Sequence, residues 1–157
     1  EAGEHIAIYG DYDVDGITSV SILWHLLTLL GGSVEYYIPH RVDEGYGVNF
    51  EAVQQVANNG AALVITVDCG ITAVEEVRHA REIGLDVIVT DHHQPGPELP
   101  PAGAIVHPML DTDYPNQDSA GAMVAFKLAW AVVNRVNRGS CRCSPSRRSA
   151  PSPTSYT

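Results

Sequence analysis

Basic residues are scarce in most of this 157-residue chain. Residues 1–133 contain all 19 acidic residues but only four basic ones, so this part has a formal charge of −15; its basic residues are Arg41, Arg78, Arg81 and Lys127. The remaining residues contain five arginines and no acid, and the net charge of the whole chain is −10. The strongly acidic composition of residues 1–133 argues against nonspecific binding of nucleic acid through a broad basic face. It leaves open a nucleic-acid enzyme whose acidic groups hold metal ions.

Cysteine, long apolar runs and a signal-peptide pattern are also lacking. The three cysteines have no disulfide or zinc-site spacing, and Cys69 is expected to be a small buried filler. No apolar run approaches the roughly 20 residues needed to cross a membrane. The chain begins at Glu1 and not at Met, so we expect the true N-terminus to be missing. These features predict a cytoplasmic protein.

Apolar runs and helical patterns alternate along the chain. Five runs rich in Val and Ile predict strands, at residues 5–10, 34–39, 62–68, 86–91 and 104–108. Helices are predicted between and after them, at residues 17–32, 49–60, 72–84 and 119–136. Asn49 is a candidate cap of the second helix, and Thr72 with Glu75 forms a candidate capping box for the third. The expected fold is α/β: a mainly parallel, doubly wound sheet of about five strands with helices on both faces.

The segment from Arg138 onward has a different composition. It consists mainly of Ser, Pro and Arg without periodicity, which predicts disorder for residues 138–157. The change from an apolar helix is abrupt, so we expect a frameshift or a truncated reading frame; the alternative is a natural basic tail that touches nucleic acid. The predicted domain is therefore residues 1–137.

Acids and histidines follow the predicted strands. Those at the strand ends are Asp11, Asp13, Asp15, Asp68, Asp91, His92, His93 and His107. The carboxyl ends of parallel strands share one edge, where open α/β proteins bind ligands. The alternative is that these residues are helix caps and turn residues, which would explain Asp15 and Asp68 better than the whole set. His107 alone fits a structural role better.

The spacing D-x-D-x-D-G from Asp11 also begins a calcium-binding EF-hand loop. Such a loop needs a bidentate Glu at position twelve, where this chain has Ile22, and it needs a helix before it. A calcium loop is therefore excluded. Carboxylates mixed with imidazole suit Mn²⁺, with Mg²⁺ tolerable where oxygens dominate.

The set contains enough ligands for two ions. Asp11 and Asp13 would serve one ion, Asp15 and His92 the other, with Asp68 bridging them. Paired divalent ions activate water for phosphoryl displacement. His93 need not bind metal; it would hydrogen-bond a phosphate oxygen or protonate the leaving group.

Three motifs in this order, "GDYDVDG", "VDCG" and "TDHH", resemble the DHH phosphoesterase superfamily. The longer segments "YYIPHRVDEGYG" and "IVTDHHQPGPELPPAGAIVHP" resemble its RecJ family of single-strand-specific 5′→3′ exonucleases. The resemblance covers about residues 3–136. It implies a Mn²⁺- or Mg²⁺-dependent phosphodiesterase, two ions in the complete domain, single-stranded DNA as substrate, and a role in DNA repair and recombination.

The resemblance also implies roles for individual residues. The matches to the metal motif are Asp11, Asp13, Asp15, Asp68 and His92, and Asp68, His92 and His93 match catalytic positions. His93 and Arg41 match phosphate-contacting residues, and Tyr46 matches an aromatic that stacks on a base. A guanidinium can form two parallel hydrogen bonds with a phosphate, and any base can stack on an aromatic ring. The structural alternatives are a surface ion pair for Arg41 and a packed loop residue for Tyr46.

Three departures separate this chain from the family pattern. A further metal-binding Asp beyond the fourth helix and a C-terminal nucleic-acid-binding domain are absent, and His107 replaces the usual Asn before Pro108. We therefore expect the chain as given to be weakly active or inactive. Two other functions stay open. One is hydrolysis of a small substrate, either a small nucleotide such as nanoRNA or a cyclic dinucleotide, or pyrophosphate; the other is a catalytically dead nucleic-acid-binding module.

Overall fold

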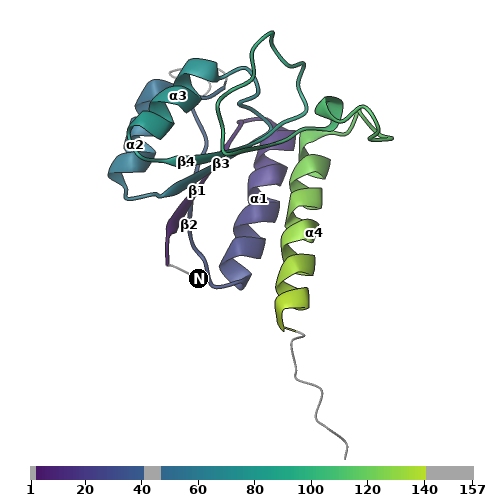
Figure 1. Ribbon diagram of the computed structural model, residues 1–157. Coiled ribbons are helices and arrows are strands. Elements are labelled where there is room, and N and C mark those ends of the chain that lie inside the picture. Colours follow the sequence, from purple (N-terminus) through teal and green to yellow (C-terminus); the bar gives the residue numbers. More distant parts are fainter. Residues whose placement is uncertain (1–2, 41–46, 141–157) are drawn as a thin grey trace, which may run out of the picture.

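The computed structural model describes residues 3–40 and 47–140 and places one sheet between two pairs of helices (Figure 1). The strands are β1 (His5–Gly10), β2 (Ser33–Tyr37), β3 (Leu63–Val67), β4 (Asp86–Thr90) and β5 (Ala104–Val106). The helices are α1 (Val14–Leu29), α2 (Phe50–Asn58), α3 (Val74–Glu82) and α4 (Gly121–Ser140), and a 3-10 turn, η1, spans Pro108–Leu110. The predicted α/β class is confirmed.

All strand pairs of the sheet are parallel, in the order β2-β1-β3-β4-β5. The chain leaves β1 toward β2 on one side and then returns to place β3 on the other side of β1. The crevice above β1 and β3 is therefore the topological switch point, where open α/β sheets bind ligands. The loops after these two strands contain the predicted Asp ligands.

Each face of the sheet has its own apolar core, because successive side chains of a strand point to opposite faces. Tyr9 and Val89 belong to the core beneath α2 and α3, whereas Ile8 and Val67 belong to the core beneath α1 and α4. Strands covered on both sides are expected to be nearly continuously apolar, as the central strand β3 is. Cys69 is buried in the first core, as predicted.

Several helix ends follow the predicted signals. The side chain of Asn49 accepts a hydrogen bond from the Ala52 amide (2.7 Å) and caps α2, as predicted. Gly31, Gly60 and Gly84 directly follow the C-terminal caps of α1, α2 and α3, and all three have the positive φ that glycine adopts without strain.

Other helix boundaries differ from the predictions. The capping box at Thr72 is wrong: α3 begins only at Val74, and its cap residue makes no side-chain hydrogen bond. Glu75 instead forms an ion pair with Arg78 one turn further along the same helix. α1 begins at Val14, three residues before the predicted start, and α4 continues to Ser140, beyond the predicted end at residue 136.

Some predicted features fall outside the described residues. Arg41, Tyr46 and residues 141–157 of the predicted tail are among them. Within the described part of the chain, no helix combines the length and the apolar character that a membrane crossing requires.

Candidate metal centre

The loop after β1 turns directly into α1 and fixes two of its aspartates. Asp13 is the N-cap of α1, and its side chain accepts a hydrogen bond from the Gly16 amide (2.8 Å). A side chain at position 16 would place its Cβ 2.5 Å from the Asp11 carbonyl oxygen, so the turn requires glycine there. The buried Asp11 carboxylate accepts a hydrogen bond from the Tyr12 amide (2.7 Å). The sequence D-x-D-x-D-G is therefore a strand-to-helix turn and not a calcium loop.

Asp68, directly after β3, is buried without hydrogen bonds. Its side chain is 1% exposed, and neither carboxylate oxygen accepts a hydrogen bond from the described residues. The Nε2 atom of His92 lies 3.1 Å from its Oδ1, in the position of an ion pair. The backbone of Asp68 has a φ of +61°, a left-handed conformation that is uncommon outside glycine.

The electrostatic state of Asp68 follows from this burial. Desolvation, together with the negative charges of Asp15 and Asp13, raises its pKa to about 7. Buried carboxylates normally have hydrogen-bond partners, and those that lack them call for an explanation such as an ion. A divalent cation would supply both the missing partner and the missing positive charge.

Asp91 anchors the motif that follows β4. Its Oδ2 accepts a hydrogen bond from the Ile71 amide (2.9 Å), and its Oδ1 accepts from the amides of His92 (2.7 Å) and His93 (3.1 Å). The Nδ1 atom of His93 also lies 2.7 Å from this Oδ1. With Nδ1 donating to Asp91, the ring presents Nε2 as its ligand or hydrogen-bonding atom.

The charge of His93 is favoured by its neighbours. Burial alone would lower the pKa of the ring, but the hydrogen bond and charge of Asp91, with Asp68 and Asp11 further away, outweigh burial and raise it. A raised pKa suits a group that donates a proton or contacts an anion.

His107, which directly follows β5, holds the backbone of this motif. Its Nε2 is 2.8 Å from the carbonyl oxygen of His93, and its Nδ1 accepts a hydrogen bond from the Met109 amide (3.2 Å). The ring is therefore the tautomer with hydrogen on Nε2, which donates to the carbonyl. His107 is buried and positions the backbone of His93, as the structural alternative for this residue anticipated.

The polar side chains form two groups that can each hold a metal ion. Ligand atoms lie within 4.8 Å of one another in the group Asp11, Asp13 and Asp68 and in the group Asp68, His92 and His93. Asp68 belongs to both groups, and its role as a bridge between two ions stays a prediction.

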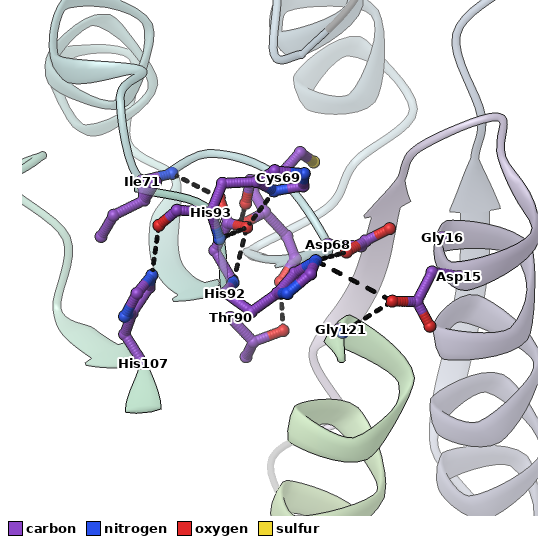
Figure 2. A network of polar contacts seen from close by, with 12 residues as sticks. Asp15, Gly16, Asp68, Cys69, Ile71, Thr90, His92, His93, His107 and Gly121 are labelled. Carbon is purple, nitrogen blue, oxygen red and sulfur yellow. Dashed lines mark hydrogen bonds and ion pairs between the residues drawn. The ribbon is translucent and has the colours of Figure 1, made fainter. Parts of the chain in front are cut away.

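Asp15 belongs to neither of these two groups. Its Oδ2 and Oδ1 accept hydrogen bonds from the amides of Gly121 (2.8 Å) and Ala122 (3.0 Å), at the N-terminus of α4. The Nε2 atom of His92 lies 3.9 Å from Oδ2, so Asp15 borders the second group (Figure 2). This arrangement differs from the predicted pairing of Asp15 with His92 as first ligands of one ion, which stays a prediction.

A cavity of about 440 Å³ adjoins His93. Its walls include Gly47, Gly70, Thr72, Glu76 and Gln94. The two carboxylates that line it, Glu76 and Asp91, make it a poor site for phosphate, so an uncharged part of a ligand suits it better.

Sequence reasoning overlooked the structural part played by Asp91 and by the start of α4. The position of Asp91 at a strand end was visible, but its hydrogen bond from Ile71 depends on the loop after β3. Gly121 has no φ that requires glycine, and its signal in the sequence is only a small residue that opens a helix without an acidic or hydroxyl cap.

Comparison with known proteins agrees with a fold and site of this kind. Residues 5–145 match the model of the "DHH family, N-terminal domain". The chain therefore belongs to the DHH family.

Relatives within this family include exonucleases named RecJ. The chain is 53% identical over 134 residues to the single-stranded-DNA-specific exonuclease RecJ of Bacillus subtilis, an alignment that covers 85% of this chain and 17% of the relative. It is 45% identical to RecJ of Escherichia coli over 132 residues, 83% of this chain and 23% of the relative. The chain thus spans about a fifth of the length of these curated relatives.

Solved structures give the same result. A crystal structure of exonuclease RecJ bound to manganese superposes with a TM-score of 0.79 at 47% identity and covers 85% of this chain and 34% of that one. RecJ of Thermus thermophilus in complex with Mn²⁺ gives a TM-score of 0.74 at 41% identity, covering 86% of this chain and 19% of that one. The resemblance inferred from the motifs is confirmed.

Proposed function

We propose that this chain is the metal-binding part of an exonuclease that hydrolyses phosphodiester bonds in single-stranded DNA from 5′ to 3′. The observation that carries the proposal is Asp68: a buried carboxylate without a hydrogen bond, shared by two groups of metal-ligand type. The relatives named as single-stranded-DNA-specific exonucleases supply the substrate class.

The residues fit two divalent cations, Mn²⁺ or Mg²⁺. Asp11 and Asp13 would hold one ion, His92 would hold the other, and Asp68 would contact both. Oxygen ligands suit either metal, and the imidazole of His92 favours Mn²⁺. The chemistry that such ions supply is polarisation of the phosphodiester and activation of water.

The protein's own groups then orient the substrate. His93, held by Asp91, contacts a phosphate oxygen or gives its proton to the leaving oxygen, and its raised pKa favours the protonated ring that either role requires. The nucleoside next to this phosphate would occupy the cavity beside His93, because a nucleoside carries no charge for Glu76 and Asp91 to repel. Arg41 and Tyr46 stay predicted contacts to phosphate and base.

The experiment compares substrates and variants on the same preparation. With Mn²⁺ present, hydrolysis of a 5′-phosphorylated single-stranded oligonucleotide is measured beside hydrolysis of a dinucleotide and of pyrophosphate. Faster hydrolysis of the oligonucleotide supports the exonuclease. Faster hydrolysis of the dinucleotide would show that the substrate is a small nucleotide and not single-stranded DNA. Asp68→Ala should abolish hydrolysis and leave the circular dichroism spectrum unchanged; a normal rate in this variant would refute the bridging role.

Mn²⁺ titration calorimetry distinguishes the third function. A nucleic-acid-binding module without catalysis requires no metal, so it predicts DNA binding without Mn²⁺ binding. The fit of Asp68 to a cation predicts instead that the chain binds Mn²⁺.

A further inference from the structure

The N-terminus of α4 lies against the candidate metal centre (Figure 2). Both oxygens of Asp15 accept hydrogen bonds from its first two amides, those of Gly121 and Ala122, at 2.8 and 3.0 Å. Amides at the start of a helix have no partner within the helix, so an outside acceptor is needed. Asp15, 106 residues earlier in the chain, supplies it and ties α1 to α4.

Gly121 also touches the unpartnered carboxylate. A Cβ atom at this position would overlap Oδ1 of Asp68 and would lie 2.6 Å from its Cγ and 3.0 Å from its Cβ. Its φ is not in the left-handed region, so conformation does not demand glycine here. Close approach to Asp68 does.

We propose that the start of α4 is a positioning element of the metal centre: the Gly121 and Ala122 amides hold Asp15 at its edge, and Gly121 leaves room for the Asp68 carboxylate. The inference rests on the proposed metal-dependent function. The positioning is thus done by two backbone amides and by the absence of a side chain at Gly121, and not by a charged or metal-ligating residue.

Two physical effects support this assignment. The amides satisfy one lone pair on each Asp15 oxygen, which fixes the carboxylate and leaves its other lone pairs directed elsewhere. The aligned peptide dipoles of a 20-residue helix also place partial positive charge at its N-terminus. That charge lies beside Asp15 and Asp68, two carboxylates that repel each other without a metal.

The first test uses the unaltered chain and Mg²⁺, a diamagnetic probe. In ¹H–¹⁵N NMR titrations, the amide resonances of Gly121 and Ala122 should shift with the same dissociation constant as the amides of Asp68 and His92. If Mg²⁺ shifts the latter pair and leaves Gly121 and Ala122 unchanged, the start of α4 is not part of the centre and the proposal is overturned.

The second test compares two identical substitutions. Gly121→Ala should weaken Mn²⁺ binding in calorimetry by roughly tenfold or more, the effect typical of changes around metal ligands. Gly96→Ala is the control, because a Cβ there makes only ordinary contacts, at 3.7 Å or more, and its Mn²⁺ affinity should equal that of the unaltered chain. Equal affinity for Gly121→Ala and the control would overturn the proposal.

Thermal unfolding without metal shows whether Gly121→Ala retains its fold. If it does not fold, the Mg²⁺ titration of the unaltered chain decides alone. A chain that binds Mn²⁺ but hydrolyses the dinucleotide in preference to the oligonucleotide refutes the proposed substrate and leaves this inference intact. A chain that hydrolyses DNA while Gly121→Ala binds Mn²⁺ normally refutes only the inference.

Discussion

The Oδ1 atom of Asp91 lies 2.7 Å from Nδ1 of His93. It also accepts hydrogen bonds from the backbone amides of His92 and His93. One buried carboxylate thereby sets the orientation of the ring and the path of the chain that carries it. Asp91 belongs to neither of the two groups that can hold a metal ion, yet the position of His93 depends on it.

Asp91→Asn should lower hydrolysis by roughly 10- to 100-fold in a preparation that is active, because outer partners of metal-site histidines have effects of this size. The amide keeps an acceptor but loses the charge that holds the His93 ring. The measurement is the steady-state rate together with the ¹⁵N shifts of the His93 ring. Asp86→Asn, at an exposed position of β4, is the matched control and should leave both unchanged.

The stability of the metal-free protein should fall as pH rises through 7. The pKa of Asp68 is raised to about 7 in the folded state by burial and by Asp15 and Asp13, whereas it is about 3.9 in an unfolded chain. Between these values the folded state binds one more proton, so the free energy of unfolding decreases with pH. The total change is at most about 4 kcal/mol, since one pKa unit corresponds to about 1.4 kcal/mol.

Urea unfolding in EDTA at pH 5, 6, 7 and 8 checks this expectation. Asp68→Asn cannot titrate at this position, so the difference between the two proteins isolates the effect of Asp68. The variant should be the more stable of the two at pH 8. Parallel pH profiles for both proteins would show that Asp68 is ionised throughout, contrary to the effect of its burial.

His107→Ala should destabilise the protein by roughly 1–3 kcal/mol, because it removes the donor to the His93 carbonyl and the acceptor of the Met109 amide. His107→Asn has both a donor and an acceptor and should lose less. Denaturant unfolding of the unaltered protein and of both variants at one pH measures the losses. Equal losses for Ala and Asn would mean that packing, and not hydrogen bonding, accounts for the effect.

Arg41→Ala should mainly raise KM for an oligonucleotide, because it removes a grip on phosphate and no metal ligand. Arg78→Ala is the control, since Arg78 on α3 pairs with Glu75 of the same helix and with Glu98 between β4 and β5. Kinetics and Mn²⁺ calorimetry are measured on the same variants. A collapse of metal affinity in Arg41→Ala would contradict the role predicted for this arginine.

The sequence alone determined the sheet, its parallel strands and the edge at which the polar residues meet. Continuous Val- and Ile-rich runs such as that around Ile65 indicate strands covered on both faces, and the strand-end positions of Asp11, Asp68 and His92 follow from connectivity. These are consequences of local pattern and of chain order, which require no knowledge of side-chain contacts.

Only the tertiary structure decided what each side chain does at that edge. Asp15 is held by Gly121 and Ala122, and Asp91 by Ile71, and such partners are distant in sequence because they depend on how helices and loops pack. The left-handed backbone of Asp68 and its missing hydrogen bonds depend on the same packing. Local pattern specifies where a residue lies along the sheet, but hydrogen bonding and burial are set by neighbours that folding brings together.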